Sequence, residues 1–414
     1  MAKHMNAPTP AAALDSAADD AARATHAALI ERAALLGRVF ANLADDYDRS
    51  GAPPQEQFQA LREAGLLRAN IARADGGYGA GLAVTRAILG EIAYGDPSVA
   101  LILAMHYSHH AMIVHDARVA ARGGVRDWPP ALAQRLTRAS LDGRALINAA
   151  QVEPALGSPS HGGLPDTIAR RDGAHWRITG HKRYVTGAPL LAWISVLART
   201  DEAEPRLGHF LVPRDAPGVR IDENWDPVGM RATVSHDVLF KDVAIPLDDA
   251  VGLKPASLGV QRDPHATAWY FSLVATIYDA AARAARDWLL DFINTRTPGS
   301  LGGAPLASLA TVQESVGRIE MRLATSDWLL RSHADAIDAD NAPATLSALV
   351  KHNVVDNAIE AVQTALELAG NHGITRRNPL ERHHRNVLCA RIHAPSNSLL
   401  RTSAGRAALN AALK

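Results

Sequence analysis

Two groups of residues in this chain have types that support chemistry. The first is His393, in the segment RIHAPSNSLLR (391–401). Its imidazole can exchange a proton near neutral pH, because the unperturbed pKa of histidine is about 6.5. The second group is Asn148 and Thr186, whose neutral side chains form hydrogen bonds without adding charge. Acid–base chemistry with neutral hydrogen-bonding partners uses residues of these types, but the types alone do not assign a role to these three residues.

The elements that must position these residues fall into three regions. Apolar residues recur three and four positions apart from about His26 to Asp142, which predicts helices. From Ala145 to Val251 the segments are short, often alternating and separated by Gly and Pro, which predicts strands. Helical periodicity then returns at about His265, and the longest expected helices are 267–295, 309–338 and 343–369.

This pattern predicts a mainly α protein with a central β domain. The expected divisions are a disordered, tag-containing N-terminus (1–25), an N-terminal helical domain (26–144), a middle β domain (145–253) and a C-terminal helical bundle (254–414).

Composition limits the partners of the protein. Lys plus Arg and Asp plus Glu both number 43 in 414 residues, so the formal net charge is zero and attraction to nucleic acid or an anionic membrane is not expected. No apolar run reaches the roughly 18 residues that a membrane helix needs. The single cysteine, Cys389, excludes a disulfide framework and favours the cytoplasm. We therefore expect a cytoplasmic protein that acts on a small molecule.

Four segments, in the order of these regions, carry a resemblance to a known family. They are QVEPALGS (151–158), KRYVTGA (182–188), VGMRATVSHDVLFKDVAIP (228–246) and LELAGNHGITRRNPLERHHRN (366–386). Together they resemble the acyl-CoA dehydrogenase superfamily of flavoproteins. The resemblance implies an N-terminal helical domain, a β-barrel-like middle domain and a C-terminal four-helix bundle.

The resemblance also implies a flavin cofactor, FAD or FMN, and a set of residues that bind it. The ring-binding residues would be Gln151, Val152, Gly157, Ser158, Tyr184 and Thr186. The residues for the pyrophosphate and adenine would be Arg296, Gln313, Glu367, Gly370, Asn371 and Gly373. Tyr184 and Thr186 are two apart on one predicted strand, so regular alternation places them on the same face. In the family an arginine at the position of Arg296 reaches the flavin of a neighbouring subunit, which implies a homo-oligomer, a dimer of dimers.

The usual catalytic carboxylate of the dehydrogenases is missing from its expected place. Ala394 stands there, and the segment 267–276, where other members carry the glutamate, has no carboxylate. His393 is instead similar to the histidine of a monooxygenase branch that resembles dibenzothiophene monooxygenase, in which Asn148 and Thr186 also have counterparts that face the flavin. Those enzymes take reduced flavin from a separate reductase and use it to activate oxygen.

The resemblance therefore predicts a reduced-flavin monooxygenase acting on a small apolar substrate, with His393, Asn148 and Thr186 as catalytic residues. Two alternatives stay open: an acyl-CoA dehydrogenase with a non-standard base, and a non-catalytic flavin-binding scaffold. No metal site is predicted, although His106 and His110 are four apart on a predicted helix. We expect that helix to line the pocket.

Overall fold

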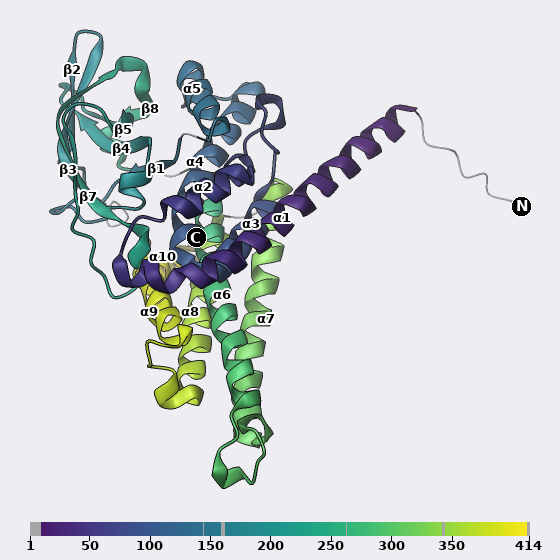
Figure 1. Cartoon of the computed structure of the whole chain (residues 1–414). Coiled ribbons are helices and arrows are strands. Elements are labelled where there is room, and N and C mark those ends of the chain that lie inside the picture. The colour runs from purple at the N-terminus through teal and green to yellow at the C-terminus, as the bar shows by residue number, and fades with distance from the viewer. Residues whose placement is uncertain (1–9, 144, 159–161, 262, 342–343, 412–414) are drawn as a thin grey trace, which may run out of the picture.

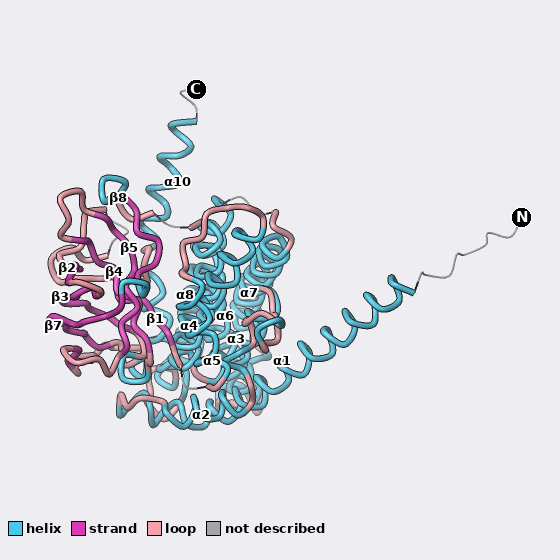
Figure 2. Tube along the Cα trace, turned by 90° about the horizontal axis from the view of Figure 1, so that it is seen from above, coloured by secondary structure: helices cyan, strands magenta, loops and turns pink. Residues whose placement is uncertain are grey.

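The protein is a three-part structure in which helices flank a sheet-containing middle region (Figure 1). The computed structural model describes residues 10–143, 145–158, 162–261, 263–341 and 344–411. Seen from above, the strands gather on one side of the molecule and most of the helices on the other (Figure 2). The predicted fold class, mainly α with a central β domain, is confirmed.

The N-terminal region consists of five helices. They are α1 (Pro10–Ser50), α2 (Gln55–Glu63), α3 (Leu82–Gly95), α4 (Pro97–Ala121) and α5 (Pro130–Leu141). Helix α4 begins directly after Asp96, whose carboxylate caps it by accepting hydrogen bonds from the backbone of Ser98 and Val99. Helix α4 is buried along most of its length, which suits its apolar sequence.

Helix α1 begins earlier than the sequence suggested. Disorder was predicted for residues 1–25, but residues 10–25 are helical and the first turns of α1 project away from the body (Figure 1). The physical reason is the alanine content of this stretch, because alanine has the highest intrinsic helix propensity and so favours a helix even in a stretch low in bulky residues. Residues 1–9, which include the predicted tag, lie outside the described residues.

The middle region holds one eight-stranded sheet. Its strands are β1 (Ile147–Ala150), β2 (Ile168–Asp172), β3 (His175–Val185), β4 (Trp193–Thr200), β5 (Arg206–Pro213), β6 (Val219–Asp222), β7 (His236–Pro246) and β8 (Ala250–Pro255). The order is β6-β7-β3-β2-β4-β5-β8, and β1 pairs in parallel with β4. Strand β1 therefore lies deep in the sheet, against β4 and close to helix α4.

The C-terminal region is a helical bundle. Its elements are α6 (Pro264–Thr295), α7 (Ala310–Asp338), α8 (Ala344–Ala369), α9 (Pro379–Leu388) and α10 (Asn397–Ala411). Helix α6 is almost fully buried at its centre, where it packs on α8, α3, α4 and α7. One hydrophobic core runs through all three regions, so the sheet and the bundle hold each other in place. Among the described residues, no helix is long and apolar enough to cross a membrane.

Candidate functional site

The sheet brings together two of the residues predicted to be catalytic. Asn148 lies on β1 and Thr186 follows the last residue of β3. The Asn148 Nδ2 donates a hydrogen bond of 2.9 Å to the Thr186 carbonyl oxygen, and the Asn148 Oδ1 accepts one of 2.6 Å from the backbone of Ala149. Because Asn148 is buried, these two bonds fix its amide and hold the Thr186 backbone.

The Thr186 hydroxyl is the end of a chain of three hydroxyls. Thr186 Oγ1 lies 3.0 Å from Ser235 Oγ, which lies 2.8 Å from Thr233 Oγ1. Thr233 Oγ1 donates a hydrogen bond of 2.8 Å to the carbonyl oxygen of Met230. Thr233 and Ser235 are buried, whereas Thr186 is partly exposed. The chain therefore runs from the interior towards an accessible end at Thr186.

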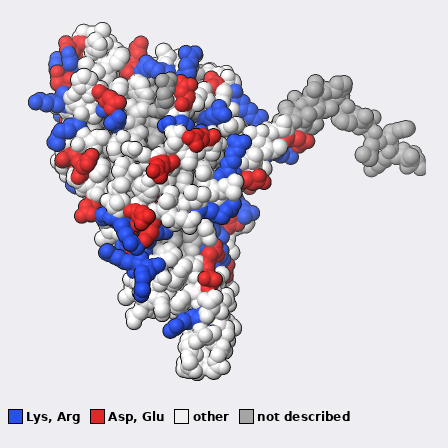
Figure 3. Space-filling view, in the orientation of Figure 1, with Lys and Arg blue, Asp and Glu red and all other residues white. Residues whose placement is uncertain are grey.

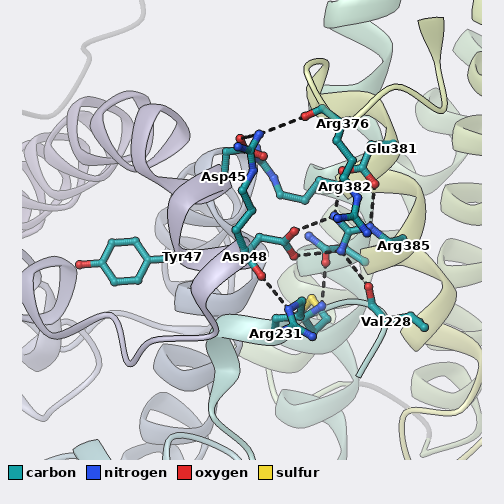
Figure 4. Close-up of polar contacts among 12 residues, drawn as sticks. Asp45, Tyr47, Asp48, Val228, Arg231, Arg376, Glu381, Arg382 and Arg385 are labelled. Carbon is teal, nitrogen blue, oxygen red and sulfur yellow. Dashed lines mark hydrogen bonds and ion pairs between the residues drawn. The ribbon is translucent and has the colours of Figure 1, made fainter. Parts of the chain in front are cut away.

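A polar junction of the three regions holds the segment that carries Thr233 and Ser235 (Figure 4). Arg231 donates a hydrogen bond of 2.7 Å to the Asp48 carbonyl oxygen on α1. Arg385 on α9 donates a hydrogen bond of 2.6 Å to the Asp48 carboxylate. Arg385 also donates to the Val228 carbonyl oxygen at 2.8 Å. The junction thus ties residues 228–231 to a helix on each side.

Backbone conformation shows that this segment is under strain. Met230 and Val234 have φ values of 55° and 42°, in the left-handed region that costs non-glycine residues of order 1–3 kcal/mol each. Asn386 on α9 holds Met230, because its Oδ1 accepts a hydrogen bond of 2.7 Å from the Met230 N–H. Contacts from α1 and α9 therefore maintain a conformation that the local sequence disfavours.

The 151–158 loop lies beside this group. Gln151 is 3.3 Å from the ring nitrogen Nε2 of His209, and the Val152 carbonyl oxygen accepts 2.9 Å from the backbone of Arg183. Gly157, at φ 68°, exchanges backbone hydrogen bonds with Glu153. A Cβ at Gly157 would meet no atom within 4 Å, so the loop borders open space. Ser158 ends the loop and is partly buried.

A buried ion pair that sequence reasoning missed anchors this loop. Lys182 Nζ lies 2.6 Å from Glu153 Oε1, and both side chains are buried. Burial opposes ionisation of Glu153, but hydrogen bonds from Lys182 and Thr167 hold its pKa below the usual value. Burial lowers the pKa of Lys182 to about 8. Glu153 lies in the motif QVEP and Lys182 in the motif KRYVTG, so the available signal was an acid and a base in two motifs that are expected to bind the same cofactor.

Tyr184 departs from the expected strand geometry. It has φ 58° at an irregularity between β3 and β7, so the regular alternation that predicted a shared face with Thr186 is interrupted. The side chain is 49% exposed. The Arg183 guanidinium lies 4.8 Å from its ring centre, and Trp225 meets it edge-on at 6.1 Å. Tyr184 thus presents an aromatic surface near the 151–158 loop.

His393 belongs to a second polar group, built by the bundle. Its Nδ1 lies 3.1 Å from the Tyr278 hydroxyl on α6, and the Tyr270 hydroxyl donates 3.0 Å to the Ala394 carbonyl oxygen. The His393 ring meets both tyrosine rings nearly edge-on, at 5.9 and 6.1 Å. The hydrogen bonds therefore place Asn148 and Thr186 in one group and His393 in another.

A buried ammonium holds the segment that carries His393. Lys351 on α8 donates to the carbonyl oxygens of His393 (3.1 Å) and Pro395 (2.9 Å) and to Asn397 Oδ1 (3.1 Å). Its side chain is 0% exposed, and burial lowers its pKa to about 8. Sequence reasoning did not identify Lys351. The available signal was its position three and four residues before Val354 and Val355, on the apolar face of the helix.

The near-neutral pKa expected for His393 is wrong in this structure. Burial and the charge of Lys351 lower the pKa of the imidazole to about 3. Tyr278 stays protonated, because burial raises its pKa well above the usual value. A buried phenol must donate its proton to avoid an unsatisfied donor, so we assign the bond as Tyr278 donating to His393 Nδ1. The ring proton is then on Nε2, and His393 acts as a neutral hydrogen-bond donor.

The residues predicted for the pyrophosphate and adenine lie at the other end of the bundle, away from the sheet (Figure 1). Arg296 ends α6 and is exposed, and Gln313, in the first turns of α7, donates 3.0 Å to the Ala307 carbonyl oxygen. Glu367, Gly370 and Asn371 are exposed at the end of α8, and Gly373 is buried there. Phe292 and His372 are 5.0 Å apart, so the ends of α6 and α8 meet. Within a single chain, these residues therefore lie apart from the Thr186 group.

The histidines of α4 do not form a metal site. His106, His109 and His110 are buried, and burial lowers the pKa values of His106 and His109 to about 4. His106 bonds to the Leu67 carbonyl oxygen at 2.8 Å and His110 to the Ser140 hydroxyl at 2.8 Å. No group of three metal-ligating side chains exists among the residues that the structure describes.

Three segments of the chain match models of one family. Residues 25–122, 149–243 and 278–398 match the N-terminal, middle and C-terminal domains of acyl-CoA dehydrogenase. The chain belongs to the acyl-CoA dehydrogenase superfamily. Its members are flavin-dependent oxidoreductases, so membership makes this protein a flavoprotein of that class. The predicted resemblance and the flavin cofactor are confirmed at this level.

Relatives within the superfamily have different activities. The putative acyl-CoA dehydrogenase YdbM of Bacillus subtilis is 29% identical over 87% of this chain and 91% of its own length. L-evernosamine nitrososynthase of a Micromonospora species is also 29% identical, over 86% and 83%. The structure of KijD3 with FMN and a dTDP-linked amino sugar has a TM-score of 0.80 and 27% identity, over 93% and 94%. The superfamily assignment by itself therefore does not decide the reaction.

Proposed function

We propose that this protein is a monooxygenase that uses reduced flavin and molecular oxygen on a small apolar substrate. The observation that carries the proposal is the environment of segment 393–397. Where a dehydrogenase would place its carboxylate base, the side chain is the methyl group of Ala394. The Tyr270 and Tyr278 phenols and the Lys351 ammonium bond to the segment at residues 393–395, and the Asp356 carboxylate accepts a hydrogen bond of 2.8 Å from Asn397 at its far end.

This environment disfavours proton abstraction from an acyl thioester. General-base catalysis needs a group with free lone pairs within hydrogen-bond reach. In the assigned tautomer His393 has no free lone pair, because Nδ1 accepts from Tyr278 and Nε2 carries the ring proton. With a pKa of about 3, the imidazole is also a weak base. The site is thus suited to donating a hydrogen bond, not to removing a carbon-bound proton.

The residues near Thr186 suit a flavin ring. They offer neutral hydrogen-bonding groups, an exposed aromatic side chain at Tyr184 and open space beside Gly157. Gln151, Val152, Gly157, Ser158, Tyr184 and Thr186 would hold the ring. A bound reduced flavin supplies the electrons that activate oxygen.

The chain's own residues then have separate roles. Asn148 holds the Thr186 backbone, so that its hydroxyl has a fixed position beside the ring. Tyr278 fixes the tautomer of His393, whose Nε2–H donates to the reacting oxygen. Neutral partners suit this step, because an unpaired charge in a pocket poor in water carries a large desolvation cost. The KijD3 structure, which contains FMN, supports a flavin as the cofactor.

Oligomerisation would complete the cofactor site. The Arg296 group and the Thr186 group lie at different ends of one chain, so we propose that Arg296 and Gln313 serve the flavin of a second copy. Helix α7 exposes Met321 and Trp328 by 74% and 69%, and these apolar side chains favour a contact between copies. Closed dimers and dimers of dimers are the usual solutions. A monomer in light scattering that still binds flavin at full affinity would refute this part.

Oxygen consumption tests the proposed reaction. The purified protein is supplied with reduced FMN or reduced FAD, generated by a separate reductase, together with a panel of small aromatic and sulfur compounds. We expect substrate-dependent incorporation of one oxygen atom, detected with ¹⁸O₂ by mass spectrometry. Anaerobic reduction of the bound flavin by an acyl-CoA at a catalytic rate would instead identify a dehydrogenase.

A further inference from the structure

The hydroxyl chain from Met230 to Thr186 has only one consistent direction. A hydroxyl has one proton, and that of Thr233 is donated to the Met230 carbonyl oxygen, so Thr233 must accept from Ser235. The Ser235 proton is then committed, so Ser235 must accept from Thr186. The Thr186 proton therefore points to Ser235, and its oxygen presents only lone pairs to the accessible side.

The inner end of the chain is fixed, so this direction does not reverse easily. The Met230 carbonyl oxygen also accepts from Trp225 Nε1 and from the Thr233 backbone N–H, both at 3.2 Å, and these two bonds fix its position. Thr233 is 0% exposed and Ser235 4% exposed, so water does not offer them other partners. The junction of Asp48, Arg231 and Arg385 holds the strained 230–234 backbone (Figure 4).

We propose that Thr233 and Ser235 are specificity-determining residues that make the site prefer reduced flavin over oxidised flavin. The proposal rests on the proposed function, in which the Thr186 hydroxyl faces the flavin ring. The ring nitrogen N5 carries a proton in reduced flavin and a bare lone pair in oxidised flavin. A hydroxyl that can only accept a hydrogen bond therefore binds the N5–H of reduced flavin and repels the N5 lone pair of oxidised flavin. An enzyme that receives reduced flavin from a reductase gains from this selection.

The expected size of the effect follows from one hydrogen bond. A typical hydrogen bond changes an equilibrium by about fivefold, and repulsion of the oxidised form adds to this preference. Wild-type protein should therefore bind reduced FMN at least about tenfold more tightly than oxidised FMN. Each factor of ten corresponds to a rise of about 30 mV in the two-electron potential of the bound flavin relative to free FMN.

Two variants break the chain at different points. In Ser235→Ala and in Thr233→Val the Thr186 hydroxyl regains the freedom to donate, so the ratio of the two dissociation constants should fall about five- to fifteenfold. Thr233→Ser keeps the hydroxyl and should keep the ratio. Thr179→Val, which removes a hydroxyl elsewhere on β3 that accepts from the Asp242 backbone, is the matched control and should leave the ratio unchanged.

The measurement is a pair of FMN titrations, one in air and one anaerobic with dithionite-reduced FMN, and a redox titration of the bound flavin. Structural loosening would weaken both forms alike, so only a change in the ratio supports the proposal. Equal affinity of wild type for both forms would overturn it. A ratio of dissociation constants that stays within twofold of the wild-type ratio in both Ser235→Ala and Thr233→Val would also overturn it. Because neither titration uses substrate, failure of the monooxygenase assay and failure of this inference are separate results.

Discussion

The two polar groups of this protein position their key residues in opposite ways. Around Thr186, the described hydrogen bonds come from an amide and two hydroxyls, all supplied by the sheet and the 230–235 segment. Around His393, the segment is held by two phenols and a buried ammonium from helices α6 and α8. Neutral side chains from the middle region hold the first group, and phenols and a cation from the bundle hold the second.

The difference has an electrostatic consequence. The Thr186 group contains no ionisable side chain in its hydrogen-bond chain, so its bonding is independent of pH across the working range. The His393 group contains Lys351, whose charge acts with burial to depress the pKa of the imidazole. A cation that supports the backbone of a catalytic residue thus also sets the protonation state of its side chain.

The largest expected effect is that of His393→Ala. Product formation should fall roughly 100- to 1,000-fold, because the hydrogen-bond donor to the reacting oxygen is lost. Folding and flavin affinity should be retained, and hydrogen peroxide release should increase. Steady-state product assays with parallel peroxide detection measure both quantities. Tyr278→Phe, which removes only the partner of Nδ1, should show a smaller loss, and equal activity of His393→Ala and wild type would rule out the role of His393.

The Thr186 side of the comparison has its own buried charge, in the ion pair that anchors the 151–158 loop. Lys182→Met leaves the Glu153 carboxylate buried without its partner, which should lower the free energy of unfolding by about 3–5 kcal/mol. Urea unfolding measures this. The double variant Lys182→Met/Glu153→Leu should recover much of the loss. Asp172→Ala, which breaks the exposed pair with Arg177, should cost less than about 1 kcal/mol.

Removing the cation tests the other side of the comparison directly. Lys351→Met leaves three acceptors without their donor and should lower the free energy of unfolding by about 2 kcal/mol. The pKa of His393 should rise, because the charge of Lys351 contributes to its depression. NMR of the labelled histidine measures that pKa. Lys254→Met, at an exposed ion pair, is the control, and an unchanged His393 pKa in Lys351→Met would contradict the electrostatic argument.

Acid should destabilise the protein through its buried histidines. The pKa values of His106, His109 and His209 are lowered to about 4 and that of His393 to about 3, chiefly by burial. The unfolded chain therefore binds more protons than the folded one as pH falls from about 6.5 to 4. Each such histidine lowers the unfolding free energy by up to about 1.4 kcal/mol per pH unit.

Buried carboxyls oppose this trend. Burial raises the pKa of Asp96 to about 6, and it also raises the pKa values of Asp249 and Asp279, so the folded state keeps protons on these groups in part of the same range. Because the four buried histidines outnumber these three aspartates, we expect the thermal midpoint to fall steadily below pH 6.5. Calorimetry in buffers of constant ionic strength measures it, and a midpoint that is flat between pH 6.5 and 4.5 would contradict the burial of these imidazoles.

The smallest expected effect is that of Thr186→Ala. Loss of one neutral hydrogen bond should weaken flavin binding by about fivefold, equivalent to about 1 kcal/mol. Anaerobic isothermal titration with reduced FMN, the form whose N5–H the Thr186 hydroxyl would accept, measures the change, and turnover with reduced flavin should decrease along with it. If neither flavin affinity nor turnover changes, the ring does not lie beside Thr186.

Local sequence patterns determined the secondary structure closely. The bundle helices predicted at 267–295 and 309–338 were observed at Pro264–Thr295 and Ala310–Asp338, because long amphipathic periodicity is a strong signal. Residues 10–25 were the exception. Their few bulky side chains suggested disorder, whereas their high alanine content favours the helix that is observed. The irregularity at Tyr184 was also missed, since a bulge depends on the partner strand and not on the strand's own sequence.

For the candidate site, the sequence by itself determined which residue types are present and, by resemblance, the superfamily. Only the tertiary structure decided which of them meet. It joined Asn148 to Thr186, added Thr233 and Ser235, and separated both from the bonds of His393. It also placed Lys351 beneath the 393–397 segment and so made His393 neutral. The physical reason is that a pKa and a hydrogen-bond direction depend on burial and on neighbours far away in the chain, which no local pattern records.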